Sequence, residues 1–456
     1  MCMEHLRRSL KKLPRTISRL YPFALIGAYF VLISLPIAFA ARQGLSGGNL
    51  SDLSSGLAMV ALSMALAQFL LSGRIRSLSG TISIDAIMRF HQLAGGILFA
   101  LVVAHPFLFA ILRAKPNLAN ALNALGFMFS SQRLLTGVGA WCLVILLALL
   151  VVFRDRLRIP YEAWRLTHGL GAAAIATAGV HHALRVGAYS HDPWLFAYWV
   201  ALVSVALVSL FQLYCITPLR QLRSPYRVTS NRQVAERLWE ISVSPEVGKP
   251  LAFSAGQFVW LKIGRSLFNM DEHPFSIASA PAEPQCLRFL IKEAGDFTRR
   301  IGKIPVGART YLDGPYGRFT FSGRQLRTIV FIAGGVGFAP IMSMLRQLAA
   351  ERYSNEIHLI YGNRTEAQIL HKDEIENLQN TLDLKVHFVL SEPPPDWTGS
   401  VGELSPEVIR GCVDASDSDA SYFVCGPTLM MRGVARALAD LGVPSRQIIS
   451  EQFRYE

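Results

Sequence analysis

The chain has 456 residues, of which 51% are hydrophobic and only 17% are charged. Its mean hydropathy of +0.33 is too high for an ordinary water-soluble protein of this length, so part of the chain must lie in lipid. The net charge of +13 belongs to residues 1–220, which hold 19 Lys and Arg against 6 Asp and Glu; residues 221–456 hold 26 of each sign. This distribution is typical of membrane topology and argues against nucleic acid as a partner. The six cysteines form no Cys-X-X-Cys pair, which excludes a zinc ribbon, clustered thiolates around iron–sulfur and a disulfide framework.

Six apolar stretches approach the roughly 20 residues that cross a bilayer core. They span residues 20–41, 53–72, 88–112, 134–153, 163–184 and 193–216. No small-residue cleavage site follows the first stretch, so we expect a retained helix and not a signal peptide. Lys and Arg gather before the first stretch, in alternate connections and after the sixth, which predicts a multi-pass protein with both termini in the cytoplasm.

The second half of the chain has a different pattern. Short β-like runs punctuated by Gly and Pro predict a small antiparallel β-barrel over residues 221–322. Over residues 323–456, apolar strands alternate with helical segments, which predicts a parallel α/β sheet. We therefore predict a multi-domain membrane protein: a six-helix transmembrane bundle over residues 1–220, then the barrel and the α/β domain.

Histidines are the notable ionisable residues inside the predicted membrane helices, where such residues are expensive and usually functional. His91 and His105 lie fourteen residues apart, which is about 21 Å of helical rise and within about 40° of one face. The fifth stretch carries His168 and then the adjacent His181 and His182. Two matched pairs on parallel helices favour two stacked haems, each ligated by two imidazoles. The alternative is that the histidines satisfy one another or a backbone carbonyl, or form a proton relay.

The second ligand on the fifth stretch has two candidates. On an ideal helix His182 repeats the face of His168, whereas a spacing of thirteen leaves His181 about 140° away. A bulge at Gly169, Gly171 or Gly179 would bring His181 round.

Two segments of the predicted barrel suit a flat, phosphorylated cofactor. His273-Pro274-Phe275-Ser276 closes a strand with a hydroxyl and backbone groups where a flat ring could dock; an ordinary strand end is the alternative. Lys292 then adds a cation. Gly295-Asp296-Phe297-Thr298 combines a glycine that admits close approach with a helix start whose amides suit pyrophosphate.

The α/β domain opens with a glycine-rich turn between an apolar strand and a helix. Gly334, Gly335, Gly337 and Pro340 let the backbone approach a dinucleotide phosphate at the helix N-terminus. Arg364 follows the next strand, where a guanidinium could meet a ribose 2′-phosphate; a solvated loop arginine is the alternative.

The end of the chain holds the remaining candidates. Cys425, Gly426 and Pro427 end the last long strand at the carboxyl edge of the sheet, where ligands bind in open α/β folds; Cys425 could otherwise be a small core residue. Phe453 belongs to an aromatic terminus able to cover a flat ring, with a frayed tail as the alternative.

In this order and spacing the motifs resemble the ferric reductase and NADPH oxidase superfamily, in which a six-helix haem domain precedes a ferredoxin-reductase-type module for FAD and NAD(P)H. The resemblance implies that His91 and His168 hold an inner b-type haem and that His105 and His181 hold an outer one, so we follow its spacing and choose His181. It also implies FAD contacts at residues 273–276, 292 and 295–298, contacts to NADPH (or NADH) at residues 334–340, 364 and 425–427, and Phe453 as the cover of the flavin.

One departure from the family concerns the electron acceptor. Its oxidases have a second histidine one turn after the outer ligand on the third helix, where this chain has Phe109; an accompanying arginine has a match in Arg42. The resemblance thus implies oxygen or a ferric chelate as a small-molecule acceptor, with Phe109 favouring the chelate. The compact form resembles prokaryotic members, which implies a bacterial inner membrane.

We therefore predict an oxidoreductase that moves electrons from cytoplasmic NAD(P)H through FAD and two b-type haems to an acceptor outside the cytoplasm, without an obligatory protein partner. The alternative is a haem–flavin subunit that donates electrons to a quinone or a periplasmic partner protein. A transporter with a regulatory nucleotide-binding domain would show broken helices or inverted repeats, and the sequence shows neither.

Overall fold

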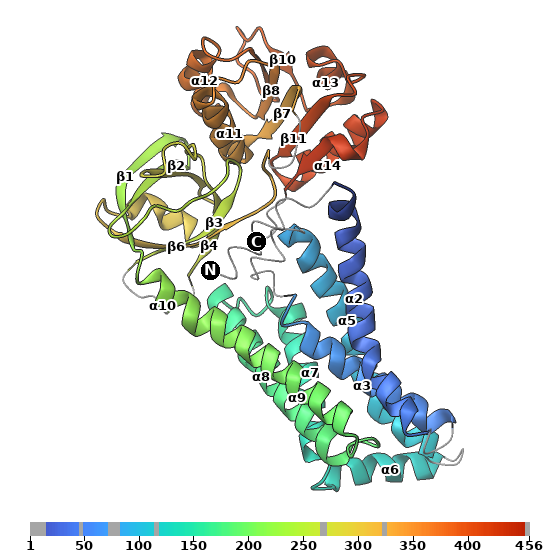
Figure 1. Ribbon diagram of the computed structural model, residues 1–456. Helices are drawn as coiled ribbons and strands as arrows, with labels where there is room; N and C mark the ends of the chain where they lie inside the picture. Colours follow the sequence, from blue (N-terminus) through green and yellow to red (C-terminus); the bar gives the residue numbers. More distant parts are fainter. Residues whose placement is uncertain are drawn as a thin grey trace. The chain divides into compact units, whose positions relative to one another are not determined.

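The computed structural model describes residues 15–44, 49–71, 83–113, 118–264, 271–321 and 326–451. The chain divides into two compact units between Ile216 and Thr217. Figure 1 shows the first as a helical unit and the second as a unit built around two sheets.

Helices occupy all six apolar stretches predicted in the first unit. They are α2 (Arg15–Arg42), α3 (Asn49–Ala67), α5 (Ile84–Arg113), α7 (Leu135–Phe153), α8 (Tyr161–Val186) and α9 (Pro193–Phe211). A helix that the sequence analysis did not predict, α6 (Leu118–Ser130), joins α5 to α7. A five-residue π-helical turn (Gln212–Ile216) extends α9 and leads into the second unit.

Within the described residues, four segments are long and apolar enough to cross a membrane. They are Phe23–Arg42, Ile84–Ala110, Leu135–Phe153 and Pro193–Gln221. The apolar part of α3 is shorter, and α8 is less hydrophobic because it carries the three histidines together with Glu162, Arg165 and Arg185. The protein is thus of a membrane type, and the crossing of all six helices stays a prediction.

The helices of this unit show their apolar side chains to the surroundings. No residue of α7 is buried, and Leu146, Leu149 and Val152 are largely exposed. Such a surface is expected where lipid replaces water as the solvent. The packed interior lies instead between α3, α8 and α9, around Leu66, Ala176 and the fully buried Trp199.

The second unit begins with a six-stranded antiparallel sheet. Its strands are β1 (Tyr226–Ala235), β2 (Leu238–Pro245), β3 (Phe258–Ile263), β4 (His273–Ser276), β5 (Leu287–Lys292) and β6 (Arg309–Tyr316), in the order β4-β3-β6-β1-β2-β5. An isolated antiparallel bridge between Ile277 and Phe289 links the two edge strands. The apolar side chains that alternate along β1, β2 and β5 form its core.

The rest of the unit is a parallel α/β sheet, as the alternation of strands and helices predicted. Its strands are β7 (Thr328–Gly334), β8 (Ile357–Asn363), β9 (Leu384–Leu390), β10 (Ser400–Val401), β11 (Ala420–Cys425) and β12 (Ile448–Ser450), in the order β10-β9-β8-β7-β11-β12. Its helices are α11 (Phe338–Ala350), α12 (Lys372–Leu378), α13 (Pro406–Cys412) and α14 (Thr428–Asp440). Separate apolar clusters cover the two faces, and β7 lies centrally, so its carboxyl end and that of β11 meet at one edge.

Candidate cofactor-binding sites

The structure brings together the first predicted histidine pair. The rings of His91 on α5 and His168 on α8 have centroids 6.4 Å apart, and their planes differ by 61°. Two imidazoles that share one metal through bonds of about 2 Å have their ligating nitrogens at most about 4 Å apart. The separation of these rings is compatible with that arrangement.

The two candidates for the partner of His105 differ in their surroundings. His182 is half-buried, whereas the side chain of His181 is exposed. The Nδ1 atom of His181 lies 3.4 Å from Thr136 Oγ1. Gly137 makes room for His182, because a Cβ atom there would lie 2.6 Å from the imidazole. The greater burial of His182 agrees with the ideal-helix argument, and the choice between it and the His181 that the resemblance implied stays a prediction.

Four of these histidines share a property. The Nδ1 atoms of His91, His105, His168 and His182 are buried, and none has a hydrogen-bond partner within the described ranges. A buried polar nitrogen without a partner is costly and calls for a ligand or ion. None of these Nδ1 atoms is bonded to another histidine in the described ranges, although the rings of His91 and His105 interact with the backbone of Gln68 and Ser54. The donor set fits two metal centres.

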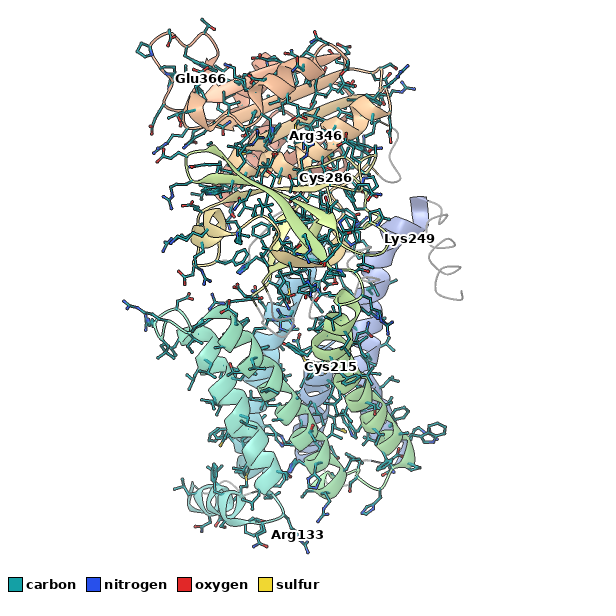
Figure 2. The ribbon with its side chains drawn as sticks, turned by 90° about the vertical axis from the view of Figure 1, so that its left-hand side faces the viewer. Arg133, Cys215, Lys249, Cys286, Arg346 and Glu366 are labelled. Atoms are coloured by element: carbon teal, nitrogen blue, oxygen red, sulfur yellow. The ribbon has the colours of Figure 1, made fainter. Side chains whose placement is uncertain are left out.

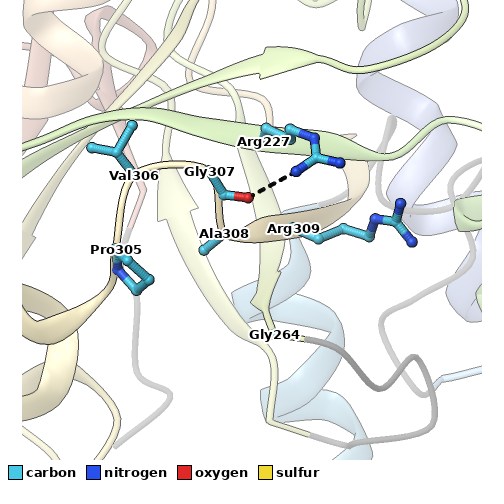
Figure 3. A pocket seen from close by; sticks show the side chains of 7 residues that line it. All are labelled: Arg227, Gly264, Pro305, Val306, Gly307, Ala308 and Arg309. Carbon is cyan, nitrogen blue, oxygen red and sulfur yellow. Dashed lines mark hydrogen bonds between the residues drawn. The ribbon is translucent and has the colours of Figure 1, made fainter.

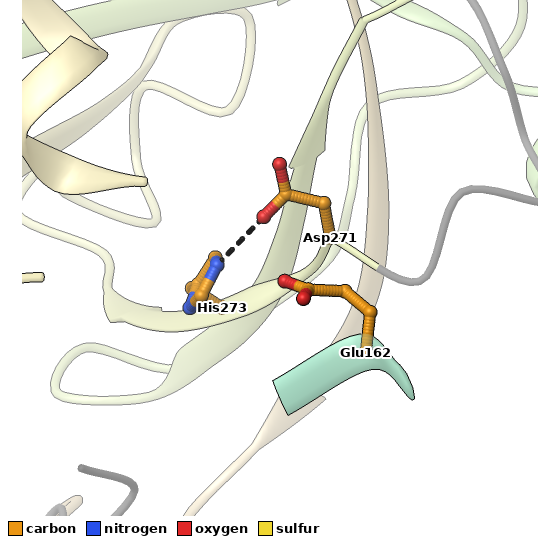
Figure 4. Close-up of side chains that lie close together, drawn as sticks. All are labelled: Glu162, Asp271 and His273. Carbon is orange, nitrogen blue, oxygen red and sulfur yellow. Dashed lines mark hydrogen bonds and ion pairs between the residues drawn. The ribbon is translucent and has the colours of Figure 1, made fainter. Parts of the chain in front are cut away.

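The two predicted flavin segments meet in the antiparallel lobe. The His273 ring on β4 stacks on Phe297, with centroids 4.4 Å apart and planes 23° apart, and Phe275 lies 6.2 Å from the same phenyl ring. His273 Nε2 is 2.9 Å from Asp271 Oδ1, as Figure 4 shows. Asp271, which the sequence analysis missed, thus holds the plane of the imidazole. Pro274 and Ser276 are half-buried on the same strand.

In the loop after β5, a threonine side chain binds two of the backbone amides. Thr298 Oγ1 accepts hydrogen bonds from the amides of Ala294 and Gly295, at 2.8 and 2.9 Å. Those two amides are therefore engaged within the loop, and a pyrophosphate contact of the segment 295–298 stays a prediction. Lys292 and Asp296 remain exposed.

The glycine-rich turn packs tightly against the end of β11. A Cβ atom at Gly337 would lie 2.4 Å from the carbonyl oxygen of Cys425, and one at Gly334 would lie 2.1 Å from Met430 Sδ. Gly335 has a positive φ of 51° and open space around it, so the turn presents its backbone there. Pro340 is buried in the first turn of α11.

Tyr361 on β8 contacts the glycine-rich turn and the start of α11. Its hydroxyl donates to the carbonyl oxygen of Gly335 at 3.2 Å, and its ring stacks on Phe338 with centroids 4.5 Å apart. The sequence analysis did not single out Tyr361, because an aromatic residue inside an apolar strand carries no signal of its own. Burial raises the pKa of its phenol, so the hydroxyl stays protonated.

Cys425, Gly426 and Pro427 occupy the predicted edge, and Pro427 precedes the first residue of α14. Burial raises the pKa of the Cys425 thiol, and the charge of Glu451 adds to this, so the group is neutral at physiological pH. Glu451 is buried directly after β12, and a Cβ atom at Gly317 would lie 2.9 Å from its Oε2. The pairing of β11 with β12 brings Glu451 to this edge, which no local pattern indicated.

Of the two remaining predicted residues, one is exposed at the surface and the other lies outside the described residues. Arg364 is 60% exposed, and its Nε lies 3.8 Å from Glu392 Oε2. Phe453 lies outside the described residues. A surface pocket in the antiparallel lobe, lined by Arg227, Gly264 and residues 305–309, contains none of the predicted cofactor contacts (Figure 3).

A buried ionic network joins the two lobes of the second unit. Arg346, which is labelled in Figure 2, lies on α11. It binds Glu374 on α12 through two contacts of 2.7 Å and donates to the carbonyl oxygen of Ala278 at 2.8 Å. His371, with a φ of 53°, places Nε2 at 3.1 Å from Glu240 on β2 and Nδ1 at 3.2 Å from Glu374. Glu240 also binds Arg232 at 3.1 Å. The lobe with the parallel sheet is thereby fixed against the lobe with the antiparallel sheet.

This network predicts how stability depends on pH. Burial opposes the imidazolium of His371, but Glu240 and Glu374 outweigh it and raise its pKa. Because the pKa of His371 is higher in the folded state, its stabilisation of the fold is complete below its unfolded-state pKa of about 6.5. This stabilisation is lost as pH rises through the folded-state pKa. Urea denaturation of the full chain should therefore show that His371→Gln is most destabilising near pH 5.5 and approaches wild type in alkali. An equal deficit at all pH values would contradict this.

Comparison with known proteins agrees with the observed folds. Residues 57–179 match the family described as ferric reductase like transmembrane component, residues 229–320 an FAD-binding domain and residues 331–436 an oxidoreductase NAD-binding domain.

Curated relatives match the second unit. NADH-cytochrome b5 reductase 1 of Candida albicans is 33% identical over 162 residues, which is 35% of this chain and 55% of that protein. The reductase component of propane 2-monooxygenase from Rhodococcus jostii is 30% identical over 244 residues, or 52% of this chain and 64% of that protein. The chain thus spans less than two thirds of these relatives.

Among solved structures, flavohemoglobin from Malassezia yamatoensis is 18% identical with a TM-score of 0.47, and the alignment covers 89% of this chain and 99% of that one. The FAD/NAD-binding domain of nitric oxide dioxygenase from Vibrio cholerae is 20% identical with a TM-score of 0.46, covering 50% and 98%. Both scores are below 0.5, so the fold assignment rests on the family matches and the sheet topologies.

A flavin-binding lobe, a nucleotide-binding lobe and a membrane-type helical unit define a membrane oxidoreductase that binds FAD and NAD(P)H. The order of the three domains is that of the ferric reductase and NADPH oxidase architecture, which confirms the resemblance seen in the sequence.

Proposed function

We propose that this protein carries electrons from NAD(P)H through FAD and two b-type haems across a bacterial inner membrane to a small-molecule acceptor. The observation that carries the proposal is the pairing of His91 with His168, whose buried Nδ1 atoms have no partner in the part of the chain that the structure describes. A bound flavin would supply the conversion between a two-electron donor and one-electron carriers. Apolar helices around the histidines would exclude water from the path.

In this proposal each histidine pair spans α5 and α8. His91 and His168 hold one haem, near the end of the bundle from which the chain continues into the second unit. His105 and His182 hold the other, near the opposite ends of the same helices. The glycine-rich turn and the end of β11 bind the nucleotide, while the stacked rings of His273 and Phe297 face the flavin.

For the acceptor we propose a ferric chelate before oxygen. Phe109, one turn beyond His105, is half-buried and offers neither a charge nor a hydrogen-bond donor from its side chain. Arg42 and Arg185 are exposed at the ends of α2 and α8 and suit an anionic chelate.

The purified full chain, supplied with FAD and NADPH, tests the proposal. We expect two haems per chain in a pyridine haemochrome assay, and faster reduction of a ferric chelate than of oxygen to superoxide in parallel assays. A chain that reduces its flavin with NADPH but contains no haem would contradict the proposal. Reduction that begins only on adding a quinone or a periplasmic extract would favour the alternative of a subunit that serves a partner.

The choice of outer ligand gives a direct prediction. His182→Leu should lose one of the two haems. The Nδ1 atom of His182, like those of His91, His105 and His168, is buried and has no hydrogen-bond partner in the described ranges. His181→Leu is the matched control and should keep both haems, since its exposed side chain contacts only Thr136 among the hydrogen-bond partners described. Haem loss in the second variant alone would restore the ligand set that the resemblance implied.

Arg364 gives a prediction for the electron donor. Its exposed guanidinium is held only loosely by Glu392, so it is available to a 2′-phosphate. Arg364→Ala should raise KM for NADPH about fivefold, equivalent to roughly 1 kcal/mol for an exposed charged contact, with little change for NADH. Arg410→Ala, another exposed arginine of this lobe, is the control. Equal effects on both nucleotides would contradict a 2′-phosphate contact.

A further inference from the structure

Trp164 lies against His168, one turn away on α8. The two ring centroids are 5.3 Å apart and the planes differ by 27°, which is a stacked arrangement. The guanidinium carbon of Arg154, which follows α7, lies over the same indole at 5.3 Å from its centroid. Arginine, indole and imidazole thus form a column that ends at His168, beside His91.

Two features of this column go beyond ordinary packing. The indole Nε1 of Trp164 is buried and has no hydrogen-bond partner within the described ranges, although a buried tryptophan usually finds one. Arg154 has an ion pair with its neighbour Asp155 at 3.3 Å, but that carboxylate is 93% exposed and screened by solvent. In this column only the Trp164 indole lies between the positive charge of Arg154 and the His168 imidazole.

We propose that Trp164 and Arg154 act on the haem that His91 and His168 hold. Trp164 positions the His168 imidazole, and the charge of Arg154 raises the reduction potential of that haem. The proposal rests on the proposed function, because it requires a haem between these two histidines. Stacking against the indole restricts the rotation of the His168 ring, and groups behind an axial ligand fix its orientation. Trp164 is therefore a positioning residue.

The charge acts on the redox equilibrium. A ferric haem carries one more positive charge than a ferrous one, so a nearby guanidinium disfavours the oxidised form, and low dielectric strengthens the effect. This haem lies at the end of the bundle where α8 begins and α9 ends, next to the connection to the second unit. A higher potential there favours electron entry from the flavin.

The test uses the full chain with both haems. Low-temperature electron paramagnetic resonance of the ferric protein reports the orientation of axial imidazoles, and a redox titration gives the potential of each haem. Trp164→Leu should alter the signal and the potential of one haem and leave the other unchanged, and Trp164→Phe, which keeps a stacking ring, should restore the signal. Arg154→Gln should shift the potential of the same haem negatively, and Arg154→Lys should not.

Arg156→Gln is the matched control. Arg156 lies in the same connection, but over the Phe153 ring at 5.5 Å instead of the column. Unchanged signals and potentials in both Trp164→Leu and Arg154→Gln would overturn the proposal, as would an equal shift in Arg156→Gln. Because Arg154→Gln removes a partly exposed group, it remains informative if Trp164→Leu fails to fold. A wild-type chain without haem would overturn the proposed function itself, which separates the two failures.

Discussion

Replacement of His168 by leucine should remove one of two haems and stop electron transfer to the external acceptor, while NADPH still reduces the flavin. His168 supplies one side of the pair with His91, and the described residues offer no third imidazole at that position. Loss of even a supporting group costs roughly 10–100-fold in metal affinity, so loss of the ligand should cost at least that much. Leucine suits a helix in lipid, so the bundle should still form.

The haem-to-flavin ratio and stopped-flow reduction measure this effect. The ratio should fall from two to one, and the rate of acceptor reduction should fall by about 100-fold or more. His191→Leu is a matched control, because His191 is exposed in the connection between α8 and α9 and belongs to neither pair. Two haems in the His168 variant would show that this imidazole is not a ligand.

Replacement of Arg346 by methionine should strongly destabilise the second unit. The guanidinium is 9% exposed and binds both oxygens of Glu374 and the carbonyl oxygen of Ala278. Burial opposes the ionisation of Glu374, but the hydrogen bonds from Arg346 and His371 outweigh it and lower its pKa to about 2. Removal of one partner from a buried pair costs about 3–5 kcal/mol; since Glu374 is 35% exposed, we expect roughly 2–4 kcal/mol.

Thermal release of FAD and urea denaturation of the detergent-solubilised chain measure the loss. Arg327→Met is the control, because the pair of Arg327 with Asp419 is exposed and should be worth less than about 1 kcal/mol. The low pKa of Glu374 also sets the direction of the pH dependence. The contribution of Glu374 to the free energy of unfolding is complete above its unfolded-state pKa of about 4.3 and is lost as pH falls towards 2. The deficit of Arg346→Met should accordingly shrink in acid. Equal stabilities for the two variants at pH 7 would contradict the role of the network.

Local patterns in the sequence predicted much of this protein. Apolar length placed six helices, because a segment that spans lipid must satisfy its backbone internally and show apolar side chains outward. Alternation of strand and helix predicted the parallel sheet from residue 323 onward, because parallel strands need crossover connections. Helical periodicity also indicated His182, whose side chain is the less exposed of the two candidates.

Contacts between distant segments were decided only by the tertiary structure. Tyr361 beside Gly335 and Glu451 near Cys425 depend on strand pairing, which local patterns do not specify. Arg346 lies on α11 and Glu240 on β2, while His371 and Glu374 belong to the start of α12. In the sequence each of these four residues looks like a solvated polar group. Their burial makes them partners, because a charge removed from water must be neutralised by whichever groups the fold brings near it.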